Sequence, residues 1–451
     1  MKYPRNLPMP TRHFAVSAAL LVAFALSGCS VLPHKKHVST PTNGNRVPVL
    51  SRIESGAAVD RSMASVAVIL PPAETNAEWA QAGGSASKSY GHPSLGASPQ
   101  EVWSTRIAGS GARQRLAASP VIGGGQLFVM DTNGMVHAYD ASTGAEHWSH
   151  SFKVSGDGAS SVYGGGVSYD QGRAYITTGV GEVAALDAKT GNQIWSVKPA
   201  GPLRGSPTIS FGNVFVMTIN NGLYALNAED GKQLWAESGS QGLAGVFGVA
   251  APAAAQGTVI TGYSTGELVA YRYENGRSLW SDALSRTSLS TVVGVLTDID
   301  ADPIIDHGRV YALGQGGRMA AYELVSGQRI WELNVAGIST PAVSGDWIFA
   351  LTDEGKLLCV AKSSGRVRWL TDLGRYANAK KKKGAIYWTG PVLAGGRLWL
   401  GNSRGQIVAA NVEDGAVTEF RRVGSAITLA PVVAGNMLYV LDDSGKINAF
   451  R

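Results

Sequence analysis

The sequence predicts an all-β protein, an eight-bladed β-propeller, on three observations. A short pattern recurs in which Gly, a variable residue, an apolar residue, another variable residue and Ala are followed by Gly six positions and Trp ten positions after the alanine. The alanines are 38 to 51 residues apart, the length of one four-stranded blade. Between them run short apolar segments rich in β-branched and aromatic residues and bounded by Gly, Asn and Asp, which predicts hairpins.

Eight copies of this pattern occur in the C-terminal three-quarters of the chain. The alanine position is Ala138, Ala185, Ala225, Ala270, Ala321, Cys359, Ala409 and Ala449. The glycine is Gly144, Gly191, Gly231, Gly276, Gly327, Gly365 and Gly415, and the aromatic residue is Trp148, Trp195, Trp235, Trp280, Trp331, Trp369 and, one place late, Phe420. Each Asp/Asn-x-x-x-Gly stretch predicts a turn with left-handed backbone at its glycine.

The eighth copy lacks its Gly and Trp half, and an isolated version of that half stands at residues 101–108 around Trp103. We therefore expect an N-terminal strand to complete the last blade and close the ring, which removes two exposed sheet edges. Seven blades is the nearest alternative to eight.

Residues 1–28 have the pattern of an export signal, with three Lys or Arg in the first 12 positions and an apolar run over residues 14–26. Thirteen residues are too few to span a bilayer as a helix. The small residues before Cys29 resemble the lipobox of bacterial lipoproteins, which implies cleavage before Cys29 and its acylation. The alternative is an ordinary secretory signal with an incidental cysteine.

Residues 29–95 are predicted to be the lipid-anchored cysteine and a flexible tether, and residues 96–451 the propeller. The tether is rich in Pro, Ser, Thr and Asn at first and in Ala, Gly and Ser later, a composition of flexible linkers. Its end, around Pro71-Pro72 and Trp79, is expected to pack on the propeller.

Composition argues against nucleic-acid binding. The leader holds three of the 39 Lys and Arg and none of the 33 Asp and Glu, so the remaining chain carries a formal charge of only +3. Cys359 stands at a repeat alanine position and is expected to be a small buried residue without a disulfide partner.

No pattern of residues indicates a metal site, a cofactor site or catalysis. The eight His are scattered, and the chain has no His-x-x-x-His or Cys-x-x-Cys spacing. The acidic stretch Asp298-Ile-Asp300-Ala-Asp302 lacks the Gly and distal Glu of a calcium loop. The run from Lys380 to Lys383 is interpreted as a solvated loop, with contact to acidic lipid or protein as the alternative.

The repeat resembles the tryptophan-docking repeat of quinoprotein dehydrogenases, most closely at Ala185-Leu-Asp-Ala-Lys-Thr-Gly191-Asn-Gln-Ile-Trp195. The same repeat occurs in the BamB family, the propeller lipoproteins of the outer-membrane β-barrel assembly machinery. The lipobox, the tether and the single ring resemble BamB over essentially the whole mature chain. Ser30 after the cysteine, in place of Asp, implies an outer-membrane anchor.

The resemblance implies a non-catalytic scaffold without a cofactor that faces the periplasm. Its implied partners are the periplasmic (POTRA) domains of BamA, other lipoproteins of the machinery and unfolded outer-membrane proteins, whose folding and insertion it assists.

Two segments resemble the loops by which BamB proteins contact BamA. They contain Leu203 and Arg204 in the first and Asp298 and Asp300 in the second, although Gly201 stands where the family often has an apolar residue. Leu203 is expected to be exposed and to supply apolar contact, with Arg204, Asp298 and Asp300 supplying charge-assisted bonds. Alternatively, Arg204 and Asp298 pair within the chain and stiffen a loop.

Two other functions remain open. A membrane-tethered dehydrogenase dependent on pyrroloquinoline quinone would need a pocket at the ring centre, calcium ligands, a catalytic Asp and commonly adjacent cysteines, which this chain lacks. A glycan- or peptidoglycan-binding propeller is the other alternative.

Overall fold

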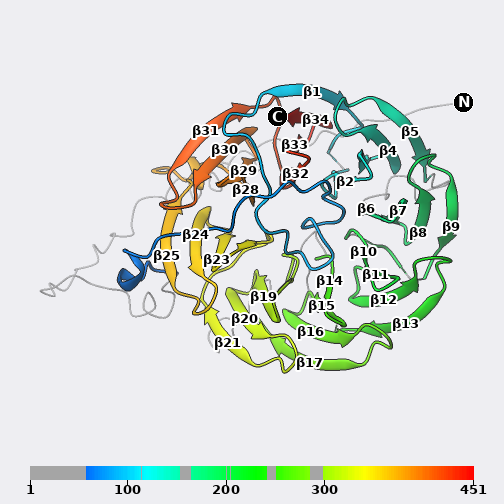
Figure 1. The fold of residues 1–451 in the computed structure, drawn as a ribbon, viewed down its shortest axis with the longest axis horizontal. Coiled ribbons are helices and arrows are strands. Elements are labelled where there is room, and N and C mark those ends of the chain that lie inside the picture. The colour runs from blue at the N-terminus through cyan, green and yellow to red at the C-terminus, as the bar shows by residue number, and fades with distance from the viewer. Residues whose placement is uncertain are drawn as a thin grey trace, which may run out of the picture. The chain divides into compact units, whose positions relative to one another are not determined.

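Eight four-stranded antiparallel sheets form a closed ring in the computed structural model (Figure 1). The structure describes residues 57–112, 114–152, 164–199, 201–203, 205–240, 250–284 and 298–451, so the predicted leader and Cys29 lie outside the described residues. Within the described part, no helix is both long enough and apolar enough to cross a membrane. The predicted all-β fold with eight blades is confirmed.

The strands of blades 1 to 7 follow one another from the centre of the ring to its rim. Blades 1 to 4 are β2 (Val121–Gly123), β3 (Gln126–Met130), β4 (Met135–Asp140) and β5 (Glu146–Ser151); β6 (Gly165–Asp170), β7 (Arg173–Thr178), β8 (Val183–Asp187) and β9 (Gln193–Val197); β10 (Thr208–Ser210), β11 (Asn213–Met217), β12 (Gly222–Asn227) and β13 (Gln233–Ser238); and β14 (Ala253–Ala255), β15 (Thr258–Gly262), β16 (Glu267–Arg272) and β17 (Ser278–Ala283).

Blades 5 to 8 continue the series. They are β18 (Ile304–Asp306), β19 (Arg309–Gly314), β20 (Arg318–Glu323) and β21 (Arg329–Leu333); β22 (Ala342–Ser344), β23 (Trp347–Leu351), β24 (Lys356–Ala361) and β25 (Val367–Asp372); β28 (Trp388–Ala394), β29 (Arg397–Asn402), β30 (Gln406–Asn411) and β31 (Val417–Arg422); and β32 (Val432–Ala434), β33 (Met437–Leu441), β34 (Lys446–Phe450) and β1 (Glu101–Arg106). A separate hairpin of β26 (Tyr376–Asn378) and β27 (Lys383–Ala385) lies between blades 6 and 7, and a short 3-10 helix, η2, spans Arg61–Met63.

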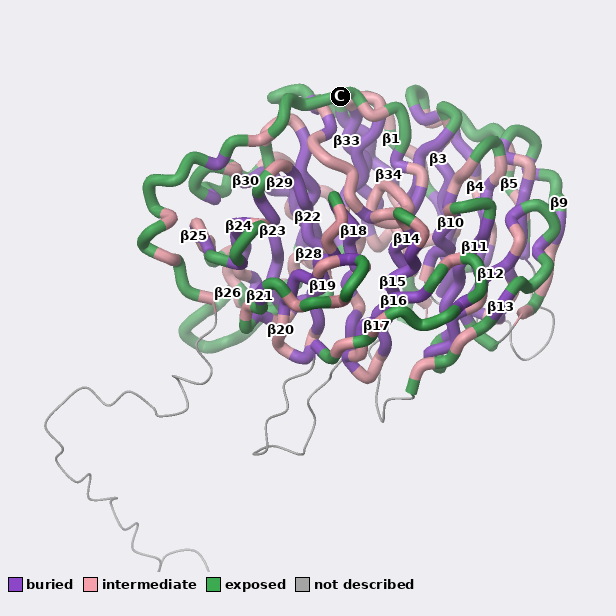
Figure 2. The backbone as a smooth tube through the Cα atoms, turned by 60° about the horizontal axis from the view of Figure 1, so that its bottom comes forward, coloured by how far each residue is buried: buried purple, intermediate pink, exposed green. Residues whose placement is uncertain are grey.

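The predicted closure of the ring is observed. β1 pairs with β34 in antiparallel register, and Trp103 lies opposite Ala449. The outermost strand of blade 8 thus comes from the N-terminal side of the propeller and its three inner strands from the C-terminal end. Figure 2 shows buried residues along the inner strands of the blades and exposed residues at the rim and turns.

The repeat alanine makes room for the tryptophan within each blade. Ala185 lies directly opposite Trp195 in the antiparallel register, so the two side chains share a face of the sheet. The same pairing occurs at Ala138, Ala225, Ala270, Ala321, Cys359 and Ala449. A small side chain is required there because the indole covers it, which explains why Cys359 is tolerated and buried.

Each tryptophan then connects its blade to the next one. Its indole N–H donates to a backbone carbonyl in the third-to-fourth strand turn of the following blade, at 2.8 to 3.1 Å. The pairs are Trp103 with Ala141, Trp148 with Ala188, Trp195 with Ala228, Trp235 with Tyr273, Trp280 with Leu324, Trp331 with Lys362 and Trp369 with Val412.

The repeat glycine forms the other half of this contact. Seven glycines from Gly144 to Gly415 have φ between +71° and +75°, and a Cβ added to any of them would lie 2.5 to 2.7 Å from an indole ring atom of the preceding blade. Glycine is therefore needed both for the left-handed turn and for the close approach of the turn to the ring.

The junction between blades 7 and 8 is built differently. Phe420 occupies the aromatic position there, and its side chain has no N–H to donate. It packs edge-on against Trp399 and Phe450 instead. The displacement of Phe420 by one place in the repeat matches a shift of the bulge in β30, where Ala409 lies opposite Thr418.

The segment before the propeller, residues 57–99, packs against the ring and contacts every blade; we call it the strap (Figure 1). It bonds to the inner strands or their turns at Ile122, Tyr169, Ile209, Ala254, Ile305, Gly395 and Gly435, which belong to blades 1, 2, 3, 4, 5, 7 and 8. At blade 6, a Cβ added to Gly345 would lie 3.0 Å from Pro71. Contacts with the ring thus begin well before residue 96, where the sequence placed the start of the propeller.

The strap has its own buried aromatic pair. Trp79 is buried, packs against Tyr90 with ring centroids 4.5 Å apart, and exchanges both backbone hydrogen bonds with Ile122 of β2. The Tyr90 hydroxyl accepts a hydrogen bond from the backbone N–H of Leu393 in blade 7. The pair therefore ties two non-adjacent blades together through the middle of the ring.

We predict that Gly231→Ala destabilises the propeller by about 2 kcal/mol more than Gly212→Ala, since overpacking a close contact typically costs 1–3 kcal/mol. The two glycines have φ of +75° and +72°, so the backbone strain is matched, but only Gly231 lies against an indole ring, that of Trp195. Urea denaturation measures both free energies of unfolding. Equal losses would contradict a role for the glycine–tryptophan contact.

We predict that Trp79→Ala lowers the free energy of unfolding by about 3–5 kcal/mol, the usual cost of removing a buried aromatic side chain. Limited proteolysis is expected to cut the strap of this variant faster than that of the unsubstituted protein. Tyr387→Ala, at an aromatic residue that is 71% exposed, is the control. A Trp79→Ala protein as stable and as resistant as the control would show that the strap is only loosely attached.

Candidate partner-binding face

The connections between blades lie on one face of the ring, which we call the loop face. In a sheet of four antiparallel strands, the link from the outer strand to the next blade emerges at the same end as the turn between the second and third strands. The connections over residues 198–207 and 284–303 therefore share this face, and they contain all four predicted partner-binding positions.

Leu203 is fully buried, so the expectation that it is exposed is wrong. It forms an antiparallel bridge to Thr218 at the end of β11, and its side chain joins the apolar cluster of Tyr175, Val183 and Ile209 between blades 2 and 3. The sequence indicated an apolar residue in a loop but contained no sign that this loop folds back against the second strand of blade 3.

Arg204 lies outside the described residues, and the chain on either side of it is held in place. The carbonyl of Gly205 accepts a 2.8 Å hydrogen bond from the Thr177 hydroxyl, and the carbonyl of Pro202 accepts one from the N–H of Ile219. Both bonds attach the connection to strand ends of blades 2 and 3.

The second connection, residues 284–303, is held in place at Ile299, between the two predicted aspartates. The Ile299 side chain is buried against Gly262 of β15, where an added Cβ would lie 2.4 Å from it. The carbonyl of Asp298 accepts a hydrogen bond from the N–H of Gln315, at the turn between β19 and β20. Asp298 itself is only 4% exposed, so it is not a freely accessible surface charge.

Asp300 has an unusual environment. Both of its carboxylate oxygens are shielded from solvent and have no hydrogen-bond partner among the described residues. Burial, together with the nearby negative charges of Asp298 and Asp353, raises the pKa of the Asp300 carboxyl to about 7. Near neutral pH this group gains little from being ionised unless a cation approaches it.

The two connections are linked across the loop face by the turns of blades 3 and 4. The Asn221 amide donates to the Ser264 hydroxyl at 2.8 Å and accepts from the Ser264 backbone N–H. Leu203 pairs with Thr218, at the start of the β11–β12 turn that contains Asn221. The backbone N–H of Ile299 donates to the carbonyl of Tyr263, next to Ser264 in the β15–β16 turn. The structure thus places the two segments on one continuous surface spanning blades 2 to 5.

Two further charged residues, Lys88 and Asp302, are buried near the second connection, and the sequence pointed to Asp302 only as part of an acidic stretch. Lys88 of the strap is 1% exposed and donates to the Thr208 hydroxyl at 3.1 Å, and burial lowers the pKa of its ammonium group to about 8. Asp302 lies near it, accepts the backbone N–H of Ala251 at 2.7 Å, and has its pKa raised by burial. A lone Lys in a Gly- and Ser-rich stretch gave no signal of burial.

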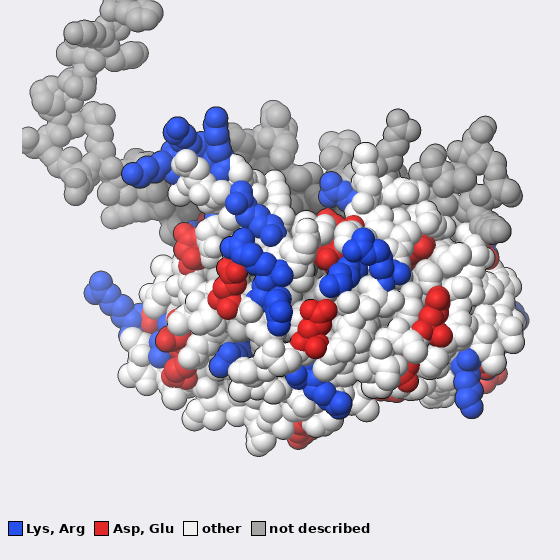
Figure 3. All heavy atoms as spheres, turned by 90° about the horizontal axis from the view of Figure 1, so that it is seen from above, with Lys and Arg blue, Asp and Glu red and all other residues white. Residues whose placement is uncertain are grey.

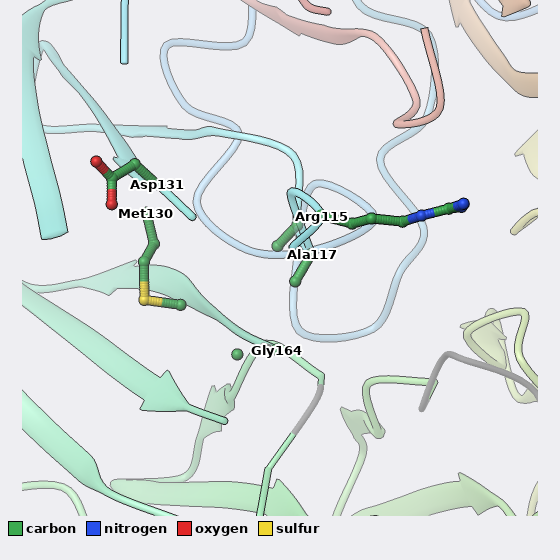
Figure 4. A pocket seen from close by; sticks show the side chains of 7 residues that line it. Arg115, Ala117, Met130, Asp131 and Gly164 are labelled. Atoms are coloured by element: carbon green, nitrogen blue, oxygen red, sulfur yellow. The ribbon is translucent and has the colours of Figure 1, made fainter. Parts of the chain in front are cut away.

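The loop face also contains a small recess beside blade 1 (Figure 4). Arg115, Met130, Asp131 and Gly164 line it, and Arg115 points away from the Asp131 carboxylate. That carboxylate already accepts the backbone N–H groups of Asn133 and Met135. The described ranges contain no group of three or more His, Cys, Asp or Glu able to hold a metal ion.

The position of the strap argues against the dehydrogenase alternative. A quinone-dependent enzyme of this fold would need a pocket at the ring centre, and the strap runs through this part of the ring (Figure 1). Cys359 is fully buried and free, and burial raises the pKa of its thiol, so it is not poised as a nucleophile.

Comparison with known proteins gives one consistent result. A family model described as outer membrane protein assembly factor BamB matches residues 95–163 and 158–371. The BamB of Yersinia pestis is 30% identical over 359 residues, covering 78% of this chain and 89% of the relative. The BamB of Escherichia coli K12 is 29% identical over 392 residues, covering 77% and 88% respectively.

Two solved structures share the fold. BamB from Moraxella catarrhalis matches with a TM-score of 0.66 and 21% identity, covering 78% of this chain and 99% of that one. The quinohemoprotein alcohol dehydrogenase from Comamonas testosteroni also matches with a TM-score of 0.66, at 14% identity, covering 84% of this chain and 81% of that one. At these identities both matches describe the fold and not the activity.

We predict that Asp300→Asn stabilises the protein at pH 8 and has little effect at pH 4. The raised pKa means that the folded state holds this proton more tightly than the unfolded state, so ionisation costs stability as pH rises from about 4 to 7. At about 1.4 kcal/mol per pH unit, the gain at pH 8 reaches up to about 4 kcal/mol.

Urea denaturation at pH 4, 6 and 8 tests this. Asp346→Asn, at an exposed aspartate in the turn between β22 and β23, is the matched control. An Asp300→Asn effect of the same size at all three pH values would contradict the buried, unpartnered carboxyl.

Proposed function

This chain belongs to the family of the outer membrane protein assembly factor BamB, and on that premise we propose that it is a non-catalytic scaffold that assists the assembly of outer-membrane proteins. The family model matches more than half of the chain, and the Yersinia pestis relative is covered over 89% of its length. The described residues present a rigid ring with buried strands and a face of irregular connections, the usual arrangement of a binding scaffold.

We further propose that the loop face binds the periplasmic domains of BamA. The observation that supports this most directly is the Asp300 carboxylate, which is shielded from water and lacks a partner within the described residues. A buried carboxylate of this kind is costly alone and favourable once a guanidinium or ammonium group meets it. A basic side chain of the partner is therefore the contact that this position fits.

The other predicted positions have different parts in this proposal. Arg204 supplies a positive charge to an acidic residue of the partner, so that the two connections recognise opposite charges. Leu203 anchors the connection before Arg204 from inside the core instead of contacting the partner itself. Asp298, mostly buried, raises the pKa of Asp300 and holds the second connection to the turn at Gln315.

The proposal includes attachment to the outer membrane. Residues 1–28 would be removed as a leader, Cys29 would be acylated, and the chain up to the strap would act as a tether, with the propeller facing the periplasm. Other lipoproteins of the machinery and unfolded outer-membrane proteins would be further partners.

The alternatives have less support. The likeness to the quinohemoprotein alcohol dehydrogenase is at 14% identity, and the strap runs through the ring centre, where such an enzyme would need its pocket. No observation on the described residues favours a glycan-binding propeller.

The test is a pull-down from detergent-solubilised membranes with the tagged full-length protein. We predict that the unsubstituted protein retains BamA and that an Arg204→Ala/Asp300→Ala variant retains at least tenfold less, since losing partners of buried charge pairs typically costs 2–5 kcal/mol. The matched control is Lys232→Ala/Asp346→Ala, at two exposed charges in turns of the opposite face. Thermal denaturation verifies that all three proteins are folded.

Retention of BamA by all three proteins would support the proposed partner but contradict the assignment of Arg204 and Asp300 as contact residues. Failure of the unsubstituted protein to retain BamA would reject the proposed partner. Equal loss in the control variant would show that the effect is general electrostatics.

A further inference from the structure

The hairpin of β26 and β27 is a fully described connection on the loop face to which the proposed function gives no role. It spans residues 374–387, and we call it the basic hairpin. It carries five cations, Arg375 and Lys380, Lys381, Lys382 and Lys383. From residue 373 to residue 412 the sequence contains no Asp or Glu, and the acidic group that acts on the hairpin from elsewhere in the chain is Asp353, near Arg375.

The basic hairpin is ordered without a core of its own. Every residue from 377 to 385 is exposed, yet Tyr376 pairs with Ala385 and Asn378 pairs with Lys383. The Asn378 side chain accepts the backbone N–H of Lys381 at 3.0 Å and closes the turn. An exposed two-stranded hairpin gains little from burial, and its four adjacent ammonium groups repel one another.

The base of the hairpin is rigidly joined to blade 7. The indole N–H of Trp388 donates to the Gly374 carbonyl at 2.9 Å, and Tyr387 exchanges hydrogen bonds with Ser403 through its backbone N–H and carbonyl. A Cβ added to Gly384 would lie 2.8 Å from Nη2 of Arg404, so this guanidinium lies against the hairpin and adds a sixth cation.

These six cations are available for binding. None of them takes part in an ion pair within the described residues. Figure 3 shows Lys and Arg side chains projecting as a group at one side of the molecule. Beside them, Tyr387 is 71% exposed although its backbone is fixed, and Tyr376 lies under the Arg375 guanidinium, 5.7 Å from its ring centre.

We propose that the basic hairpin docks on a membrane surface that contains anionic phospholipids. Lys380, Lys381 and Lys382 lie in the turn and Lys383 begins β27, so the four positive charges are spread along an exposed turn. Lysines of this kind match a surface with spread negative charge, and juxtaposed exposed tyrosine suits the boundary between headgroups and acyl chains.

This attachment is separate from the contact proposed for Asp300. The basic hairpin follows blade 6, whereas Asp300 lies in the connection from blade 4 to blade 5, so the two contacts use different residues. Asp353, in the turn between β23 and β24, lies near both Asp300 and Arg375. Membrane contact at the hairpin would turn part of the loop face toward the lipid and restrict how the ring is presented to its partners.

The test is co-sedimentation with phospholipid vesicles, using a chain that begins at residue 30 so that neither the leader nor Cys29 contributes. All buried core residues of the described ring and strap lie between Val68 and Phe450, so this chain retains the entire described core. The vesicles contain either phosphatidylcholine alone or phosphatidylcholine with about 30% phosphatidylglycerol, a fraction chosen to give a strongly negative surface.

Three variants are compared with the unsubstituted chain. The first replaces Lys380, Lys381, Lys382 and Lys383 by Gln, and the second replaces them by Arg. The matched control, Lys189→Gln/Lys198→Gln/Lys232→Gln/Arg277→Gln, removes the same charge from exposed cations without ion pairs in blades 2 to 4. Thermal denaturation checks that each variant is folded.

We expect the unsubstituted chain, the Arg variant and the control to bind the anionic vesicles. The Gln variant of the hairpin is expected to bind at least tenfold more weakly, and salt of about 0.5 M should release all of them because surface charge is screened. Binding that is equal on both kinds of vesicle, or equal in the hairpin Gln variant and the control, would overturn the proposal. Absence of binding by the unsubstituted chain would also overturn it and leave an acidic protein as the occupant.

Discussion

The contact on which the propeller depends is the one between a tryptophan of one blade and a glycine turn of the next. The indole N–H donates to a carbonyl of the turn, and the glycine of that turn lies against the indole face. Each blade by itself is a small sheet with two apolar faces, which it can bury only against its neighbours. Because the contact recurs at seven of the eight junctions, the ring geometry follows from one local interaction, and Phe420 replaces it with aromatic packing at the eighth.

The ring creates a second constraint at its centre, which the strap satisfies. The innermost strand of each blade has one edge that no other strand of the blade covers, and unpaired backbone groups there would be costly. The strap supplies hydrogen bonds to seven of these strands or their turns and inserts Trp79, Tyr90 and Lys88 between blades. The strap residues before residue 95 lie outside the match to the family model, so this chain stabilises its ring with a segment that the model does not describe.

Because the blade contacts and the strap hold the ring together, the connections on the loop face can differ from one another in sequence and charge. The connection after blade 4 hides a carboxylate that gains most from an approaching cation, whereas the connection after blade 6 exposes several cations that gain most from a broad anionic surface. A rigid scaffold allows such opposite electrostatic features to coexist, because each connection is held at its base by bonds to its own blades.

The sequence by itself determined the fold class, the number of blades and the closing strand, because each depends on local spacing that repeats along the chain. Alanine opposite tryptophan, glycine in a left-handed turn and the isolated Trp103 are all local requirements. Tertiary structure decided the burial of Leu203, of Lys88 and of the Asp300 carboxylate, since burial depends on which distant strands lie nearby. Leu203 was expected at the surface because its segment resembles a partner-contacting loop of the BamB family, yet its backbone pairs with Thr218 and its side chain packs in the core between two blades. The strap was interpreted as mostly linker for the same reason: its Gly- and Ser-rich composition is typical of a flexible tether, and only the closed ring provides the edges with which it pairs.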